Sequence, residues 1–323
     1  MEPSSRPLTL LRTAAGSPPS VSQYRAFQAL GCRVVAVDCD PAAVGFHFAD
    51  AAHCVPRVGA PGYLTRMLEI CRAEGVDLLL PALDEELVLC ARNRARFEAL
   101  GTRLLVSRPE ALQICTDKLK TYQLFRELGL PTPATVTAAD YREGALEGFP
   151  LVVKPRSGRG GTGVHVVRNH REAAFFASYV ADAVVQEHCP GDEYTIDVLA
   201  EPEGEVRICS PRRRLAVDSG ISSRGATEWR EELLAPVRRL TRALGLVGPV
   251  NIQCFIAEAP RFTEINARLA GTAILSQAAG VPYFQGILGM ARGRPVEPWL
   301  KPAAPVVMFR YWEELFRPPE ARP

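Results

Sequence analysis

The sequence predicts an α/β unit with a parallel sheet at the N-terminus, followed by an α+β unit with largely antiparallel strands. Over about the first 110 residues, short apolar segments alternate with helical ones, which is typical of βαβ units. Pro131 and Pro133 mark a linker. Beyond residue 189, strand-like segments follow one another with local turns, which favours hairpins.

In the N-terminal unit, a buried strand is expected at Arg33–Asp38, after a helix that ends near Gly31. The segments that follow alternate helix and strand: 63–74, 77–81, 85–100 and 103–106. Asp38 at a strand end could accept a ribose, but the preceding segment Thr13–Ser20 has one glycine and two prolines. It therefore lacks the turn that dinucleotide binding requires. Asp38 could instead face a substrate or cap a turn.

A helical stretch is expected from Pro109 to Gly129, with apolar residues at near-helical spacing. A small α/β unit should follow over 134–188. Strands are expected at 194–200, 205–209, 250–256, 261–265 and 306–309. The predicted domains are 1–112, 113–188 and 189–323.

Composition excludes several classes of protein. The 323 residues carry a net charge of only +2, and no basic run is interleaved with aromatic residues, so a nucleic-acid-binding protein is not expected. The triplet at 212–214 is better explained as a solvated edge or a local anion contact. Nine scattered cysteines without a Cys-x-x-Cys indicate reduced thiols, and no segment approaches the length of a membrane span. A cytoplasmic protein without a membrane partner is therefore expected.

The segment 154–163, KPRSGRGGTG, joins two apolar segments through a glycine-rich basic turn. Glycine allows backbone N–H groups to approach phosphate closely. Lys154 is one of only four lysines, and its compact ammonium differs from the planar fork of arginine. The pattern predicts a phosphate clamp on a hairpin.

Polar residues alternate along two later strands. Asn251 and Gln253 share one face, and Glu264, Asn266 and Arg268 share one side of the next strand. Oxygen ligands of modest charge suit Mg²⁺, which keeps waters and shares phosphate oxygens with a protein. The alternative is a polar sheet face satisfied by cross-strand hydrogen bonds.

Four motifs in this order resemble the ATP-grasp superfamily, in its carbamoyl-phosphate-synthase-like and biotin-carboxylase-like branch. They are Asp117-Lys118, the glycine loop after Lys154, the segment 186–194 and the pattern Gln253…Glu264-x-Asn266-x-Arg268. The resemblance implies an ATP-grasp fold preceded by a Rossmann-like pre-ATP-grasp domain. It also implies a ligase that turns a carboxylate into an acyl phosphate for attack by an amine.

The resemblance further implies roles for individual residues. Lys118 and Lys154 would contact the phosphates of ATP, and the loop that contains Ser157, Gly160 and Gly161 would close over them. Glu187, His188 and Cys189 would form the adenine hinge, and Glu193 would accept the ribose hydroxyls. Gln253, Glu264 and Asn266 would hold Mg²⁺, with Mn²⁺ as the alternative ion. Arg268, Lys154 and Asn266 would act in catalysis.

Other implications concern substrates and departures from the family pattern. A small carboxylate and an amine are the expected substrates, contacted by Arg214, Arg224 in the 218–225 loop and Arg268, and a homodimer is compatible with the family. Asp84 and Glu85 could approach an amine or cap a helix. Three residues depart from the family pattern. His188 and Cys189 are unusual in the hinge, and Gln253 stands where many relatives have a glutamate, which lowers the negative charge of the expected metal site. Two alternatives stay open: an enzyme that works through carboxyphosphate or carbamate, and a nucleotide-binding module without catalysis.

Overall fold

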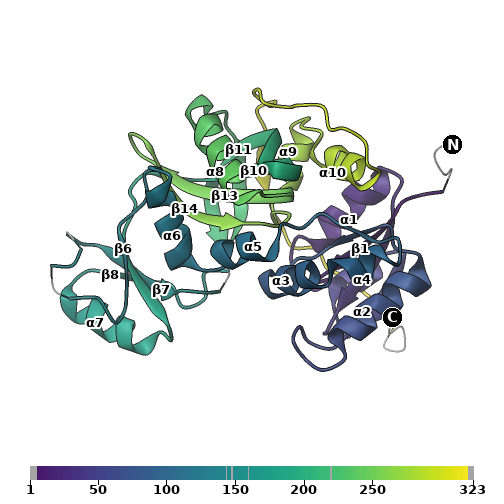
Figure 1. The fold of residues 1–323 in the computed structure, drawn as a ribbon, viewed down its shortest axis with the longest axis horizontal. Coiled ribbons are helices and arrows are strands. Elements are labelled where there is room, and N and C mark those ends of the chain that lie inside the picture. Colours follow the sequence, from purple (N-terminus) through teal and green to yellow (C-terminus); the bar gives the residue numbers. More distant parts are fainter. Residues whose placement is uncertain (1–5, 143, 147, 159, 219, 319–323) are drawn as a thin grey trace.

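The computed structural model describes residues 6–142, 144–146, 148–158, 160–218 and 220–318. Its strands form three sheets of five, six and four strands. Figure 1 shows the six-stranded sheet in the middle, with the other two sheets at opposite ends. This mixed architecture, a parallel sheet followed by antiparallel sheets, confirms the predicted fold class.

The N-terminal sheet is parallel, with the strand order β3-β2-β1-β4-β5. Its strands are β1 (Thr9–Thr13), β2 (Arg33–Asp38), β3 (Ala51–Cys54), β4 (Leu78–Leu80) and β5 (Arg103–Leu104). Its helices are α1 (Ser20–Ala29), α2 (Tyr63–Glu74), α3 (Asp84–Arg92) and α4 (Arg94–Glu98), with a 3₁₀ turn at Val44–His47. Strands β2 and β3 lie on one side of β1 and β4 and β5 on the other, so the strand order reverses between β1 and β4.

Two helices predicted as continuous are broken. The helix expected over 85–100 breaks at Asn93, whose side-chain amide donates to the carbonyl of Leu89. The stretch from Pro109 divides into α5 (Pro109–Cys115) and α6 (Lys118–Glu127). Asp117 accepts from the N–H groups of Leu119 and Lys120, and this cap starts α6. In both cases a short polar side chain competes for backbone hydrogen bonds within a helical pattern.

The four-stranded sheet carries the glycine loop. It has the order β6-β9-β7-β8 and is antiparallel in each pairing. The predicted hairpin is confirmed, because β7 and β8 pair on either side of the loop. The elements are β6 (Thr135–Thr137), β7 (Leu151–Pro155), β8 (His165–Val167), α7 (His170–Tyr179) and β9 (Ala183–Glu187).

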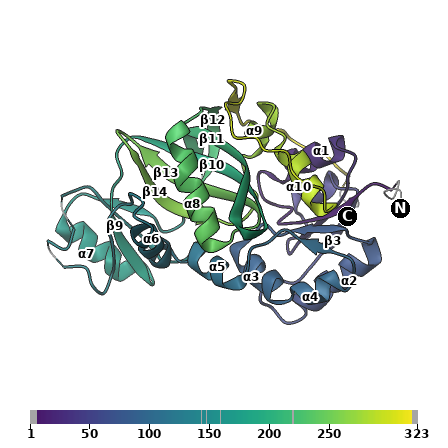
Figure 2. The same cartoon turned by 45° about the horizontal axis from the view of Figure 1, so that its top comes forward.

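The six-stranded sheet has the order β14-β13-β10-β11-β12-β15 and is antiparallel throughout. Figure 2 shows α8 lying across one face. That face is apolar, since Tyr194, Ile252 and Phe262 belong to the same buried cluster as Val237 and Leu240 of α8. The strands are β10 (Asp192–Glu201), β11 (Glu205–Asp218), β12 (Ile221–Thr227), β13 (Gly248–Ile256), β14 (Pro260–Asn266) and β15 (Val307–Phe309).

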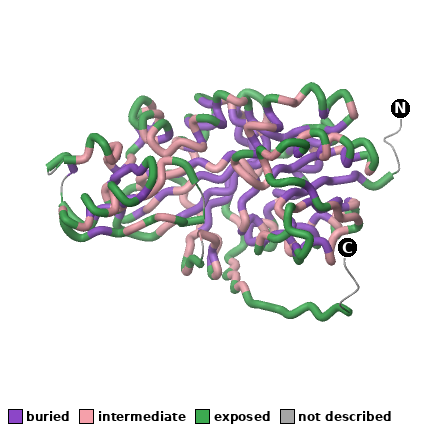
Figure 3. Tube along the Cα trace, turned by 90° about the horizontal axis from the view of Figure 1, so that it is seen from below, coloured by how far each residue is buried: buried purple, intermediate pink, exposed green. Residues whose placement is uncertain are grey.

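The remaining helices surround this sheet: α8 (Leu234–Leu244), α9 (Ile274–Ala278) and α10 (Tyr283–Ala291), with 3₁₀ turns at Pro202–Gly204 and Glu231–Leu233. The predicted loop at 218–225 is wrong, because β11 and β12 form a hairpin through most of it. Figure 3 shows the buried centre and an exposed chain after β15. The expected domain boundaries near residues 112 and 188 stay predictions.

Candidate functional site

A cavity of about 880 Å³ is lined by all three sheets. Gly158, Gly160 and Gly161 of the glycine loop lie on one side, and the polar face of β13 and β14 lies on another. Residues that follow β1 and β4, such as Ser17 and Leu83, close the end formed by the N-terminal sheet. Its volume lies in the range typical of sites for drug-sized ligands.

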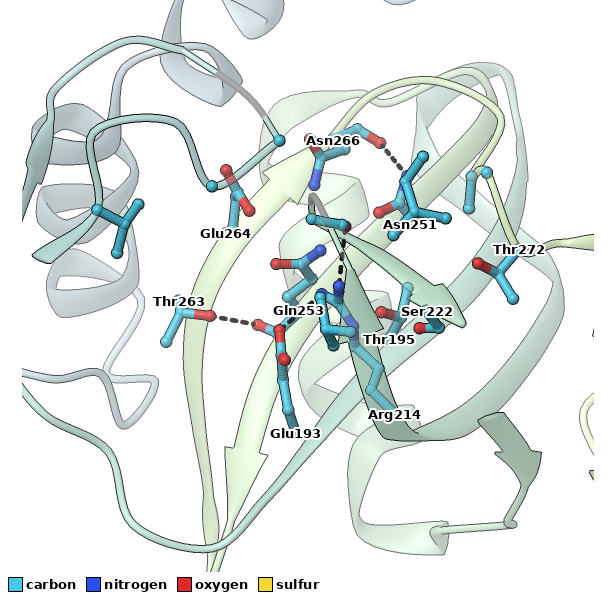
Figure 4. A pocket seen from close by; sticks show the side chains of 18 of the residues that line it. Glu193, Thr195, Arg214, Ser222, Asn251, Gln253, Thr263, Glu264, Asn266 and Thr272 are labelled. Atoms are coloured by element: carbon cyan, nitrogen blue, oxygen red, sulfur yellow. Dashed lines mark hydrogen bonds and ion pairs between the residues drawn. The ribbon is translucent and has the colours of Figure 1, made fainter. Parts of the chain in front are cut away.

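Strand register brings the predicted polar residues together. Gln253 pairs with Glu264, and Asn251 pairs with Asn266, across β13 and β14. Thr195 of β10 lies opposite Gln253 on its other side. Side chains of paired residues point to the same face, so these side chains line the cavity (Figure 4), while Ile252 and Cys254 are buried on the opposite face. The alternation predicted from the sequence is confirmed.

Lys118 and Lys154 approach the cavity from different elements. Lys118 is the first residue of α6, and its ammonium donates to the carbonyl of Gly158 at 3.0 Å and lies 3.9 Å from Glu264 Oε1. Lys154 is on β7 and donates to Gln186 Oε1 at 2.8 Å. Asp117 forms a two-bond ion pair with Arg156, which attaches the start of α6 to the end of β7. This pair explains why the aspartate precedes Lys118.

The ammonium of Lys154 is easier to deprotonate than that of an ordinary lysine. Burial and the nearby Lys118 lower the pKa of Lys154 to about 8, against the opposing effect of Glu264. A polyanion placed beside Lys154 would favour its charged form. The pKa of Lys154 in the free protein therefore lies below that of an ordinary lysine, at about 8.

We expect the affinity for Mg-ATP to fall as the pH rises through about 8. Below this pH Lys154 is already protonated, whereas above it binding must take up a proton, which costs up to about tenfold in affinity per pH unit. Calorimetric titration across this range checks the expectation, with Lys154→Met as the control that should lose the dependence. A wild-type affinity that stays flat from neutral pH to well above 8 would contradict it.

The glycine loop lies against the β11–β12 turn. A Cβ atom added to Gly220 would lie 2.5 Å from the Cα of Gly160, and Gly220 has a φ of +76°. Only glycine tolerates both the conformation and this close approach. The turn at Gly220 thus forms one wall of the enclosure around the loop.

The hinge between β9 and β10 contains His188, which is exposed, and Cys189, which is buried. Burial raises the pKa of the Cys189 thiol. Glu187 is already engaged: its N–H donates to the carbonyl of Ala134, and its carboxylate accepts from the N–H of Ala134 and from Arg261. The backbone groups of His188 and Cys189 are thus better candidates than the N–H of Glu187 for contacting the adenine ring of a nucleotide.

The Glu193 carboxylate accepts from Arg214 at 2.6 Å, and Arg214 also donates to the carbonyl of Gly220 at 2.8 Å. Burial raises the pKa of Glu193, and Arg214 opposes that shift. The Gln253 amide satisfies both neighbours once its oxygen and nitrogen are exchanged, which puts the nitrogen 2.8 Å from Glu264 Oε2 and the oxygen 3.2 Å from Arg214 Nη1. Arg214, predicted as a substrate contact, is therefore anchored among the polar residues of the sheet.

The donor set fits Mg²⁺ only in part. The described residues contain no cluster of three or more His, Cys, Asp or Glu side chains suited to a metal. Glu264 and Asn266 supply a carboxylate and an amide oxygen, which fits an ion that takes its other ligands from phosphate and water. Gln253 fits this set only if its amide rotates, because its oxygen faces Arg214.

Arg268 connects the sheet with the N-terminal unit. Its guanidinium donates to Asn266 Oδ1 at 3.3 Å and to Asp84 Oδ1 at 3.0 Å. Asp84 is the first residue of α3, and its carboxylate also forms an ion pair with Arg268. Asp38 accepts from the N–H groups of Gly16 and Asp40, which makes it a turn cap.

The structure brings most of the predicted site residues to the cavity, with two exceptions. Ser157 and Arg224 are both exposed, and neither is among the lining residues. The lining residues that the sequence did not suggest include Arg12 and Thr195. Arg212 and Arg214 point into the cavity, whereas Arg213, between them, pairs with Asp192 and Glu228. Period-two alternation within β11 could have separated the three arginines.

Family comparisons match two segments of the chain. Residues 115–272 match the ATP-grasp domain, and residues 10–105 match the family described as the PylC-like N-terminal domain. The first segment contains both lysines, the glycine loop and the Glu264–Asn266 strand. The chain carries an ATP-grasp domain.

This ATP-grasp chain is 29% identical over 215 residues to the carbamoyl phosphate synthase large chain of Xylella fastidiosa (strain Temecula1 / ATCC 700964), covering 57% of this chain and 20% of that protein. The chain thus spans about a fifth of that relative.

Two solved structures share the fold. The biotin carboxylase of Campylobacter jejuni, a complex with a β,γ-ATP ligand, has a TM-score of 0.72 at 18% identity, covering 92% of this chain and 73% of that one. The L-amino acid ligase of Bacillus licheniformis has a TM-score of 0.69 at 20% identity, covering 91% of this chain and 76% of that one. Among the described residues, no helix is both long and apolar enough to cross a membrane.

Proposed function

We propose that this ATP-grasp protein is an ATP-dependent ligase. It activates a small carboxylate as an acyl phosphate, which an amine attacks to form a C–N bond, and it releases ADP and phosphate. The observation that carries the proposal is one cavity with two lysines and Glu264 at one end and Arg268 toward the N-terminal sheet. The cavity therefore offers adjoining sites for a triphosphate and a carboxylate.

Phosphoryl transfer depends mainly on positioning and charge neutralisation. Lys118 and Lys154 would neutralise the phosphates, and the N–H groups of Gly160 and Gly161 would contact them. His188 and Cys189 would contact the base through their backbone, and Glu193 would contact the ribose. Arg268 would stabilise charge on the transferred group and the acyl phosphate.

Glu264 and Asn266 would hold Mg²⁺, and Mn²⁺ would suit the same oxygen donors. When bound, the ion would offset charge on the phosphate oxygens. Lys118, 3.9 Å from Glu264, would share the same phosphates. The substrates would be small molecules, and a homodimer remains an expectation from the resemblance.

A carboxyphosphate-forming enzyme is the second candidate, because the relatives include a carbamoyl phosphate synthase chain and a biotin carboxylase. Both candidates use the same phosphate-binding residues, and they differ in whether bicarbonate is the carboxylate. A non-catalytic nucleotide-binding module is the third possibility.

ADP release, measured across a panel of carboxylates with and without amines and bicarbonate, tests the proposal. We expect release to require a carboxylate and an amine, and Glu264→Ala to lower it by about 100-fold or more. Glu69→Ala, which removes an exposed glutamate of α2, is the matched control. Release with bicarbonate alone would favour the second candidate, and nucleotide binding without turnover would favour the third.

A further inference from the structure

Arg12 is a buried guanidinium that lines the cavity from the end of β1, with 4% of its surface exposed. Its Nε and Nη2 donate to Gln23 Oε1 at 3.2 and 3.0 Å, and its Nη1 donates to the carbonyl of Leu80 at 2.9 Å. Both acceptors are neutral. Among the described residues, no carboxylate lies within ion-pair distance of Arg12.

A buried charge without a counter-ion is costly. Burial lowers the pKa of Arg12 to about 10, so the group remains cationic at neutral pH. Tyr24 and Glu86 oppose that shift in the pKa of Arg12, and Glu86 already accepts from Thr13, Tyr63 and the N–H groups of Ala82 and Leu83. Arg268 adds a second positive charge, and its own ion pair is with Asp84.

The bonds of Arg12 leave room for a carboxylate. A guanidinium has five N–H groups, and three are used here. One N–H remains on each terminal nitrogen. A carboxylate can accept one hydrogen bond from each terminal nitrogen of a guanidinium.

The position of Arg12 also points to a ligand. In the order β3-β2-β1-β4-β5, β2 and β3 are added on one side of β1 and β4 and β5 on the other, so the strand order reverses between β1 and β4. Open parallel sheets bind ligands in the crevice at the carboxyl ends of strands at such a switch point. Arg12 bridges this crevice through Leu80 of β4, and Ala14 and Leu83 line the cavity beside it.

Hydrogen bonds through Gln23 link the Arg12 guanidinium to the ATP-grasp domain. Gln23, which accepts from Arg12, donates through Nε2 to the carbonyl of Ala270 at 3.0 Å. Ala270 lies two residues after Arg268 and also lines the cavity. Arg268 donates to Asn266, a candidate Mg²⁺ ligand, whereas Arg12 donates to the carbonyl of Leu80 in the N-terminal sheet. The two guanidinium groups thus line the same cavity from different segments, Arg12 from β1 and Arg268 from the chain after β14.

We propose that Arg12 binds a carboxylate that does not react, on a small substrate of this protein. The proposal rests on the proposed ligase function and narrows its substrate class. The substrate carries either a second carboxylate, as a dicarboxylate, or the carboxylate of an amino acid that supplies the amine. Lys118 and Lys154 hold the phosphates, and Arg268 holds the reacting carboxylate. Arg12 holds the carboxylate that does not react.

Direct binding tests the site without turnover. In the presence of Mg-ADP, the affinities of succinate, glutarate and L-alanine are measured by calorimetry beside those of succinamate, glutaramate and L-alaninamide, in each of which one carboxylate is replaced by an amide. We expect the wild type to bind at least one acid about tenfold more tightly than its amide. Arg12→Gln should lose this preference and keep its affinity for Mg-ADP, and Arg12→Lys should retain part of it.

Arg33→Gln, in the neighbouring strand, is the matched control and should behave as the wild type. Equal binding of acids and amides to the wild type would overturn the proposal, as would a preference that survives in Arg12→Gln. Binding of inorganic phosphate but of no acid would overturn the assignment to a carboxylate. If Arg12→Gln does not fold, the acid-to-amide ratios of the wild type and Arg12→Lys decide, and an unchanged ratio in Arg12→Lys would contradict a bidentate contact.

ADP release separates this inference from the proposed function. Release with a dicarboxylate and a simple amine would place the second carboxylate on the activated substrate, and release that needs an amino acid would place it on the amine. An acid preference that depends on Arg12 but comes with no ADP release would contradict the ligase alone. Release with simple monocarboxylates and amines, unaffected by Arg12→Gln, would contradict the Arg12 site alone.

Discussion

Replacing Lys154 by methionine is expected to weaken Mg-ATP binding by about 10- to 100-fold, because a hydrogen bond to a charged group contributes about 1.5–3 kcal/mol. The site is partly buried, and among the described residues that line the cavity Lys118 is the only other lysine, so the variant keeps one ammonium there in place of two. Calorimetric titration measures the affinity. Methionine keeps the length of the stem and removes the charge.

Lys120→Met is the matched control for this experiment. Lys120 lies on the same helix as Lys118 but is exposed and is not among the residues that line the cavity. Its replacement should leave the affinity unchanged. An affinity of the Lys154→Met variant equal to that of the wild type, with an unaltered unfolding midpoint, would remove Lys154 from the phosphate site.

The second large effect concerns stability. Asp197 is fully buried and accepts two hydrogen bonds from Arg212, at 2.8 and 3.0 Å, and a third from Ser276 at 2.7 Å. Asp197→Ala would leave the Arg212 guanidinium buried without its partner. We expect the free energy of unfolding to fall by about 3–5 kcal/mol, as measured by denaturant titration.

A double variant separates the charge effect from packing. Asp197→Leu combined with Arg212→Met removes both charges, and we expect it to recover most of the loss. The exposed pair of Arg66 and Glu69 provides the control, because Glu69→Ala should cost less than about 1 kcal/mol. A single variant Asp197→Ala with wild-type stability would show that Arg212 finds another partner or water.

The six-stranded sheet shows how far alternation along a strand predicts a site. Gln253 and Glu264 were expected on one polar face, and their direct pairing follows from a short connection between two strands. The orientation of the Gln253 amide did not follow, because it depends on Arg214 of β11, two strands away from β13. Local sequence holds no information about such a partner.

Helix boundaries were harder to predict than helix existence. The apolar spacing predicted helices over most of 85–100 and 109–129. The first is divided at Asn93, whose side chain donates to the carbonyl of Leu89, and the second at Asp117, which caps the start of α6. Likewise, the serine- and glycine-rich composition of 218–225 favoured a loop. Pairing of β12 with both β11 and β15 overrides that local preference.

The glycine loop after Lys154, the lysine after Asp117 and the polar face of two strands could be recognised from the sequence, because each depends on spacing within a short segment. The role of Arg12 could not. Its neighbours Leu80 and Gln23, and the link to Ala270, come from segments up to 258 positions away. Whether an arginine is solvated, paired or buried without a counter-ion depends on the charges that the fold places around it, and only the tertiary structure decides that.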